Sequence, residues 1–397
     1  MSEINLKDSN QAICKKHFAD LVCDEFTMSI FNGGQTAADE KLANLDITGY
    51  AKKRNNVYPE RKRGSSYLSP YIRHGLLSLN EVWSVVEDYP YEDKVKFRDE
   101  LLWQEFSRHL YAIMGKKMSK NLNYTMINTN KTVNTQEMNC INTITEELTK
   151  TGYMVNQTRM WFSSHHAFRA ENNWKVYEDF MFRHLVDGSR YANRLGWHWV
   201  MGNQTGKLYG FAQSQVKNRA KKLCEECSLQ YNCPIKMWPD ENRFEDVNQK
   251  FDFDIISKFG PQHIVDTGKK PEIVWITGES LGDDDPAMKS YPDLPVLFIF
   301  DSILLKHLQI STKRINFLLD TLKELAVKKN LVVHVGDPQK ILQNYNYAST
   351  HACVPKYKDI ISKNMPVVEF PTRRLVEPID FYPKSYTSWK KNIVLTQ

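Results

Sequence analysis

The stretch Thr151–Asn203 decides the reading of this chain: TGYMVNQTRMWFSSHHAFRAENNWKVYEDFMFRHLVDGSRYANRLGWHWVMGN. It sets Trp161, Trp174, Trp197 and Trp199 into a helical pattern. If residues 153–168 form a helix, Asn156, Arg159 and Met160 share one face, because they stand three and four positions apart. The residues alone leave two interpretations open. One is a ligand cavity, and the other is an aromatic helical hairpin in which Arg159 pairs with Asp187.

Composition sets broad limits. The chain has 397 residues, of which 41% are hydrophobic and 25% charged, which is typical of an ordinary globular protein of two domains. Its net charge of +6 permits a polyanionic partner without requiring one. The N-terminus MSEINLKDSN lacks a signal peptide's apolar core, and no apolar run approaches the roughly 18 residues of a membrane helix. We therefore expect a cytoplasmic monomer with no membrane partner, whose seven cysteines are thiols or metal ligands.

The period of the sequence changes after Pro271. Short β-branched runs at 272–277, 295–300, 331–335 and 366–370 alternate with helical patterns at 311–329 and 338–343, which predicts a parallel, Rossmann-like α/β sheet. A GxGxxG dinucleotide fingerprint is absent, so a generic α/β interaction domain also fits. The predicted organisation is an N-terminal helical extension (1–30), an all-helical domain (31–240), a linker (241–270) and the α/β domain (271–397).

Two further segments carry polar candidates. Residues 64–69 read GSSYLS and follow six basic residues between Lys52 and Arg63, so their hydroxyls and amides could meet a phosphate. A serine-rich helix cap explains the same residues without a ligand. Residues 93–114 form an amphipathic pattern in which Glu100 and Trp103 stand at i and i+3, either as a site pair or as a helix-surface pair.

Four cysteines form a candidate metal site. Cys224, Cys227 and Cys233 lie in CEECSLQYNCP, and Cys140 precedes the helical pattern INTITEELTKTGYM. Three thiols at this spacing with a distant fourth suit an iron–sulfur cluster or a structural zinc ion. Chance clustering is the remaining alternative.

The stretch beginning at Thr151 closely resembles the flavin-binding core of the photolyase and cryptochrome family. The matched strings are TGxMxNxxRM at 151–160 and DGxxxANxxGWxW at 187–199. The resemblance is strong over roughly residues 31–235 and moderate over 271–391. In the family the α/β antenna domain comes first, whereas here it follows the helical domain. The chain therefore resembles a circularly permuted member: a mainly α flavin-binding domain followed by an α/β domain.

The resemblance implies FAD as cofactor and assigns roles to single residues. It implies flavin contacts at Tyr50, Ser65, Ser66, Leu68, Ser69, Arg159, Asp187 and Asn193. It implies catalytic residues at Glu100, Trp103, Asn156, Met160 and Trp199, and electron transfer through Trp197 and Trp174, with Tyr124 as a candidate outer residue. Two positions depart from the family pattern, because Gln104 stands where an Arg is usual and Ser189 where a second Asp is frequent.

The implied activity is light-dependent repair of cyclobutane pyrimidine dimers in UV-damaged DNA, by electron transfer from excited reduced FAD. The four cysteines are similar to those of a branch that holds a 4Fe–4S cluster, and that branch is associated with (6-4) lesions and an active-site histidine. The nearest candidates for that histidine are His165 and His166. A blue-light-sensing cryptochrome and a zinc-stabilised DNA-binding scaffold without flavin are the other readings.

An antenna chromophore of unknown identity is also implied by the resemblance of the C-terminal third. The matching positions are Asp285-Pro286-Ala287, Asp301 and Gly336-Asp337-Pro338. The Arg-rich motif that usually begins this domain is replaced by TGESLGDDD, so the binding of a chromophore stays open.

Overall fold

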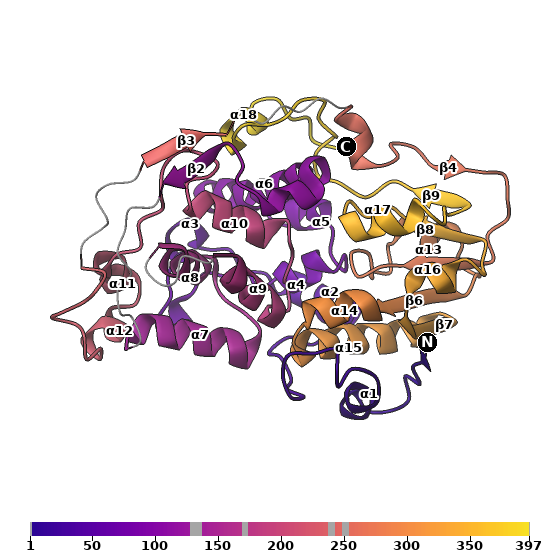
Figure 1. Ribbon diagram of the computed structural model, residues 1–397, viewed down its shortest axis with the longest axis horizontal. Helices are drawn as coiled ribbons and strands as arrows, with labels where there is room; N and C mark the ends of the chain where they lie inside the picture. The colour runs from indigo at the N-terminus through magenta and orange to yellow at the C-terminus, as the bar shows by residue number, and fades with distance from the viewer. Residues whose placement is uncertain (1, 128–136, 169–173, 237–242, 248–253, 397) are drawn as a thin grey trace.

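The computed structural model describes residues 2–127, 137–168, 174–236, 243–247 and 254–396 (Figure 1). A helical part, built mostly from residues before 226, lies beside a sheet built mostly from residues after 272. The predicted combination of helices with a sheet that contains parallel strands is confirmed. Within the described residues, no helix is both long and apolar enough to cross a membrane.

The helical part contains twelve α-helices among the described residues. They are α1 (Asn10–His17), α2 (Gln35–Ala43), α3 (Tyr50–Lys53), α4 (Ser69–Arg73), α5 (Leu79–Ser84), α6 (Tyr91–Met114), α7 (Asn139–Thr151), α8 (Asn156–Phe168), α9 (Trp174–His184), α10 (Ala192–Val200), α11 (Gln213–Arg219) and α12 (Lys221–Glu225). Short 3-10 turns cover Glu60–Lys62, Gly115–Ser119 and Ile256–Phe259, and the strands β2 (Tyr124–Ile127) and β3 (Arg243–Asp246) form a separate antiparallel pair.

The remaining elements build the α/β part. Its strands are β1 (Ser2–Glu3), β4 (Val265–Asp266), β5 (Ile273–Ile276), β6 (Val296–Asp301), β7 (Leu331–Gly336), β8 (Tyr347–Thr350) and β9 (Val368–Phe370). Its helices are α13 (Pro286–Ser290), α14 (Ser302–Leu308), α15 (Thr312–Lys328), α16 (Pro338–Leu342), α17 (Pro355–Ile361) and α18 (Tyr386–Lys390).

The sheet has the order β1-β7-β6-β5-β8-β9-β4, with five central parallel strands and an antiparallel strand at each edge. The chain therefore proceeds outward from β5 in one direction through β6 and β7, and in the other through β8 and β9. The point of reversal lies between β5 and β8, and crevices at such points are where open α/β sheets bind ligands. The sequence pattern missed β8, because its residues YAST carry little of the β-branched apolar signal.

The turn between α7 and α8 sets the start of the motif helix. Gly152 ends α7 with φ of +75°, a left-handed conformation that favours glycine. A Cβ at Gly152 would lie 2.8 Å from the Val186 side chain, so glycine is also required by the close packing. The predicted helix over 153–168 consequently begins at Asn156 rather than Tyr153.

The N-terminal segment is tied to the α/β part. The Asp24 carboxylate accepts hydrogen bonds from the Ser311 hydroxyl (2.6 Å) and the Thr312 backbone N–H (2.7 Å), and it pairs with the Lys313 ammonium at 2.9 Å. The Asp24 carboxylate therefore pairs with a backbone N–H group that the first turn of α15 leaves without a partner within the helix. Ser2 and Glu3 pair with β7 at the sheet edge.

The C-terminal segment returns to the helical part, where α18 packs against α6. Trp389 is fully buried, and its indole N–H donates to Nδ1 of His109 at 3.2 Å. Its ring lies 5.4 Å from that of Phe106, so the end of the chain contributes to the core beneath α6.

Trp389→Ala should lower the free energy of unfolding by about 3–5 kcal/mol, because it leaves a large cavity and an unpaired His109. Urea denaturation would measure the change. Val394→Ala is the matched control, since Val394 is 67% exposed and should change stability by less than about 0.5 kcal/mol. Equal stability of Trp389→Ala and the parent protein would contradict the account of α18 as a core element.

Candidate functional site

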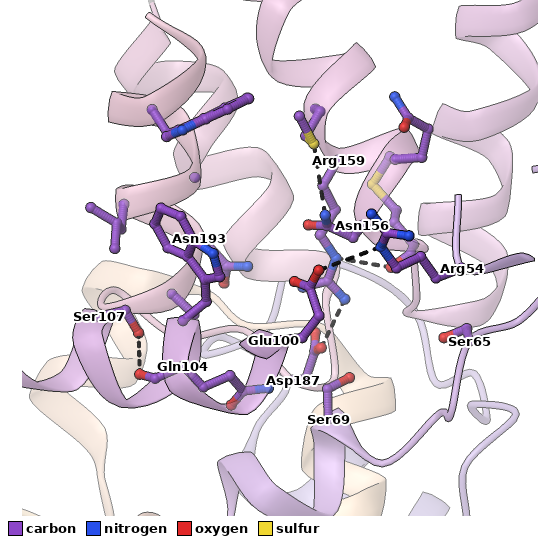
Figure 2. Close-up of a pocket in the computed structure, with 18 of the residues that line it drawn as sticks. Arg54, Ser65, Ser69, Glu100, Gln104, Ser107, Asn156, Arg159, Asp187 and Asn193 are labelled. Carbon is purple, nitrogen blue, oxygen red and sulfur yellow. Dashed lines mark hydrogen bonds and ion pairs between the residues drawn. The ribbon is translucent and has the colours of Figure 1, made fainter. Parts of the chain in front are cut away.

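A cavity of about 570 Å³ lies in the helical part (Figure 2). Its walls come from α3, α4, α6, α8, α9, α10 and α11 with their loops, and the lining residues run from Tyr50 to Arg219. Twelve of the predicted site residues line it: Tyr50, Ser65, Ser66, Ser69, Glu100, Trp103, Asn156, Arg159, Met160, Asp187, Asn193 and Trp199. The structure thus brings residues that were singled out from separate segments into one cavity.

An ion pair joins α8 to the loop before α10. Nη2 of Arg159 lies 2.8 Å from Oδ2 of Asp187, and Nε donates to the Met154 carbonyl at 2.8 Å. Burial lowers the pKa of the Arg159 guanidinium, but the charge of Asp187 outweighs burial and raises the pKa overall. The second carboxylate oxygen of Asp187 is buried and has no hydrogen-bond partner among the described residues. A buried acceptor of this kind is ready to receive a donor from a ligand.

The serine loop supplies hydroxyl groups to the same cavity. The Ser65 hydroxyl shares a 2.6 Å hydrogen bond with the Tyr153 hydroxyl, while the Ser66 hydroxyl accepts from the Leu68 N–H at 3.4 Å. Ser69 begins α4, and its buried hydroxyl has no hydrogen-bond partner in the described part of the chain. Leu68 is only 1% exposed and packs into the core, so its side chain does not line the cavity.

Glu100 stands among cations on another wall. One of its carboxylate oxygens lies 3.0 Å from Nζ of Lys96 and 3.5 Å from Nε of Arg54. Gln104, which occupies the position of the missing Arg, also lines the cavity. Sequence reasoning missed Arg54 and Arg219 as lining cations, although Arg54 belongs to the basic run that begins at Lys52.

The two cavity tryptophans are held by neighbouring tyrosines. Trp103 is stacked on Tyr386 of α18, with ring centroids 3.8 Å apart and an interplanar angle of 11°. Trp199 lies 5.3 Å from Tyr209, whose hydroxyl accepts from the Gln157 amide at 2.5 Å. Sequence patterns did not indicate either tyrosine, because both contacts cross between distant or irregular segments.

The remaining polar residues are ordered by local bonds. The Asn156 amide lies 3.7 Å from Sδ of Met160, as expected for one helix face. The Asn193 carbonyl oxygen accepts from the Ser189 N–H at 2.7 Å, which leaves the amide as the donor end of Asn193. The Ser189 hydroxyl accepts from the Ala192 N–H at 3.2 Å and so supports the start of α10.

Trp197 and Trp174 lie behind the cavity rather than in its lining. Trp197 is fully buried and stands one helical turn after Asn193 on α10. Its ring centroid is 6.3 Å from that of Trp174, at an angle of 35°. Tyr124 lies in β2, where its ring is 6.4 Å from Phe244. The proposed electron-transfer roles of all three stay predictions.

The histidine pair of α8 lies away from the cavity. His165 and His166 are buried, and His166 stacks on Tyr177 at 3.7 Å. Burial, and then the neighbouring His165, lower the pKa of His166 to about 2, so it is neutral at physiological pH. No histidine is among the described residues that line the cavity.

The four predicted metal ligands meet at a second place. Cys140 at the start of α7 and Cys224, Cys227 and Cys233 around α12 line one small apolar pocket. Burial, followed by the proximity of Cys224, Cys233 and Cys227, raises the pKa of the Cys140 thiol to about 12. Four thiols that repel each other's charge without a metal form a donor set suited to a soft metal centre.

The antenna-like aspartates act as helix caps. Asp285 accepts from the Met288 N–H, Asp301 from the Leu304 N–H and Asp337 from the Gln339 N–H, at 2.9 to 3.0 Å. Each precedes the first turn of a helix, where a carboxylate is favoured without any ligand. These residues therefore give no support of their own to a bound chromophore.

Comparison with known proteins points in one direction. No protein-family model matches the chain. A deoxyribodipyrimidine photo-lyase of Synechococcus is 27% identical over 187 residues, which cover 42% of this chain and 38% of that protein. Those of Buchnera aphidicola and Thermus thermophilus are 27% and 29% identical, over 50% and 38% of this chain and 45% and 38% of theirs. The chain is similar to photolyases. These relatives support the photolyase and cryptochrome family, and the chain spans less than half of their length.

Two solved photolyase-family structures were also found. A class III photolyase from Agrobacterium tumefaciens aligns over 48% of this chain and 44% of its own, with 22% identity and a TM-score of 0.42. A cryptochrome from Synechocystis aligns over 50% and 46%, with 20% identity and a TM-score of 0.43.

Asp187→Asn should lower the free energy of unfolding by about 2 kcal/mol, because it leaves Arg159 without its counter-charge. The loss falls below that of a wholly buried pair, since the Arg159 side chain is 19% exposed. Urea denaturation measures it. Glu146→Gln is the control, because its pair with Lys150 is about 70% exposed and should contribute less than about 0.5 kcal/mol. Equal losses in both variants would contradict the special status of Asp187.

Proposed function

We propose that this chain is a light-dependent DNA photolyase that splits cyclobutane pyrimidine dimers, with FAD as its cofactor. The observation that carries the proposal is the single cavity lined by twelve residues predicted from separate motifs. Similarity to deoxyribodipyrimidine photo-lyases at 25–29% identity supports it.

The residues of the cavity fit FAD. The orphaned oxygen of Asp187 offers an acceptor for a ring N–H, and the Asn193 amide offers a donor. The Arg159 guanidinium provides a fixed positive charge, which favours an anionic reduced ring. The hydroxyls of Ser65, Ser66 and Ser69 lie where a pyrophosphate would find donors. When bound and reduced, FAD supplies the electron that light sends to the lesion.

The opposite wall fits a flipped pyrimidine dimer. Lifting the lesion out of the duplex costs a few kcal/mol, which base stacking on aromatic rings offsets by roughly 1–3 kcal/mol per base. Trp103 and Trp199 supply these rings, and their supporting tyrosines hold them in place before the substrate arrives. Glu100 would hydrogen-bond to the pyrimidine edge, while Asn156 and Met160 line the space between.

The choice of lesion follows from the absence of histidine in the cavity lining. Repair of a (6-4) lesion relies on a histidine as proton donor, whereas His165 and His166 are buried elsewhere on α8. Splitting a cyclobutane dimer needs no such donor. The described lining residues therefore favour the cyclobutane lesion over the (6-4) lesion.

UV-damaged DNA is the partner that this proposal implies. Arg54 and Arg219 line the cavity and supply positive charge in place of the Arg that Gln104 replaces. Cations at the mouth of a base-flipping cavity would contact backbone phosphates. We further propose that the α/β part corresponds to the family's antenna domain in permuted order, which the element order of the chain supports.

The purified reduced protein should convert dimers in single-stranded oligothymidylate to monomers under blue light and not in the dark. Trp103→Ala should weaken binding of the dimer roughly 5- to 150-fold through lost stacking. Glu100→Gln should retain binding and repair fewer dimers per absorbed photon. Trp83→Ala is the control, since Trp83 contacts Arg98 outside the cavity. A protein that binds flavin but leaves dimers intact in light would refute repair and favour a sensory role.

We also propose that Cys140, Cys224, Cys227 and Cys233 hold a 4Fe–4S cluster. Their convergence on one apolar pocket supports a bound metal centre, and the likeness of the four positions to the cluster-holding branch favours iron–sulfur over zinc. Such a cluster would fasten α7 to α12 and so stabilise the far end of the helical part.

Anaerobically purified protein should contain about four iron and four acid-labile sulfide per chain, and Cys224→Ser should lose most of both. Metal analysis with sulfide determination tests this. Cys23→Ser is the matched control and should retain the cluster, because Cys23 lies far along the chain beside Asp24. Stoichiometric zinc without sulfide would contradict the cluster.

A further inference from the structure

A second cavity of about 110 Å³ lies where the two parts of the molecule meet. It opens at the carboxyl ends of β8 and β9, beside the reversal point of the sheet order, and α6 closes its other side. Open α/β sheets place reactive sites at such ends. The lining includes a set of residues that the proposed light reaction does not use, namely His351, Cys353, Thr372 and Arg374.

His351 belongs to an imidazole–carboxylate pair with Glu369 of β9. Nδ1 of His351 lies 2.8 Å from Oε1 of Glu369, and this oxygen also accepts from the Tyr357 hydroxyl at 2.9 Å. His351 is only 5% exposed. Its other ring nitrogen, Nε2, is buried and has no hydrogen-bond partner among the described residues. A Cβ on Gly260 would lie 2.3 Å from Nε2, so the Gly260 backbone packs against this ring edge as closely as only glycine allows.

Cys353 follows His351 by two residues and lies beside the cation Arg374. Nη2 of Arg374 donates to Sγ of Cys353 at 3.6 Å, and the thiol donates to the Phe259 carbonyl at 3.3 Å. Cys353 is partly exposed, in contrast to the buried Cys14. A partly accessible thiol next to an arginine and a carboxylate-held histidine is the arrangement of a reactive cysteine rather than a structural one.

The electrostatics agree with the geometry. Burial raises the pKa of the Cys353 thiol, but His351, Arg374 and Lys358 outweigh burial and lower it to about 7. Burial likewise opposes the charged form of His351, yet Cys353 and Glu369 raise its pKa. The two groups therefore stabilise each other as thiolate and imidazolium. The charged and titratable groups around them are Glu369 on β9, Tyr357 and Lys358 on α17, Arg374 after β9 and Glu105 on α6.

We propose that Cys353 is a modification site at which small hydroperoxides oxidise the thiolate to a sulfenic acid, with His351 as the proton donor. The small volume of the cavity favours hydrogen peroxide or a short alkyl hydroperoxide. The inference does not depend on the light reaction.

The step balances without another reactant. The sulfur attacks the terminal peroxide oxygen, so that the S–O bond forms and the O–O bond breaks. The sulfur is oxidised by two electrons and the peroxide is reduced. The leaving alkoxide or hydroxide takes the proton from Nε2 of His351, which gives alcohol or water and neutral imidazole. Glu369 holds the ring orientation through Nδ1, and Arg374 stabilises the negative charge on sulfur.

The test is alkylation of the folded full-length chain by iodoacetamide across about pH 5.5–9.5, with peptide mass spectrometry to resolve each cysteine. Cys353 should alkylate with a midpoint near pH 7. Cys23 is the internal control, because it is also partly exposed while its pKa is raised to about 11, mainly by burial. After treatment with hydrogen peroxide, dimedone should label Cys353 and leave Cys23 unlabelled.

Two variants test the role of His351 and its support by Glu369. Glu369→Gln should move the alkylation midpoint of Cys353 upward, toward the ordinary thiol value of about 8.5, and His351→Asn should do so and reduce dimedone labelling. Glu369→Gln preserves side-chain volume, so it decides the matter if His351→Asn unfolds. A parent midpoint at or above about pH 8.5, absence of dimedone label on Cys353, or an unchanged midpoint in Glu369→Gln would each overturn the proposal.

Discussion

The ion pair between Arg159 and Asp187 is the contact on which the large cavity depends. It joins α8, which carries Asn156 and Met160, at 2.8 Å to the loop that leads into α10, which carries Trp199. A buried pair of this kind is expensive to break, because either partner alone is a charge with little solvent. The pair therefore fixes two walls relative to each other. It also leaves one acceptor of Asp187 unsatisfied, so the same residue supports the fold and offers a binding group.

The cavity is further stabilised by the end of the chain. Tyr386 of α18 covers one face of Trp103, and Trp389 packs beneath α6. The aromatic wall of the cavity is consequently shared between segments that are about 280 residues apart in the sequence. This contact lets the α/β part and the segments after it influence the geometry of a site that the helical part otherwise builds by itself.

The surroundings of Cys140 and Cys353 shift the pKa values of their thiols in opposite directions. Cys140 is surrounded by apolar residues and other sulfurs, which raise the pKa of its thiol. Cys353 is surrounded by a histidine, an arginine and a lysine, which lower the pKa of its thiol. Sequence spacing could identify the first group, since three of its members lie within ten residues. It could not identify the second, because Glu369 and Arg374 come from β9 and the segment after it.

The sequence by itself determined the helices of the motif region, four of the five parallel strands and the residue types of the cavity, because periodicity and short motifs are local properties. It placed Asn156, Arg159 and Met160 on one face, and the structure has them there. Only the tertiary structure decided that Arg54 meets Glu100, that Tyr386 stacks on Trp103, and that Glu369 holds His351 beside Cys353. These contacts join segments with no common pattern. These contacts form because the folded chain packs the segments that carry them against each other, and this packing depends on the whole chain.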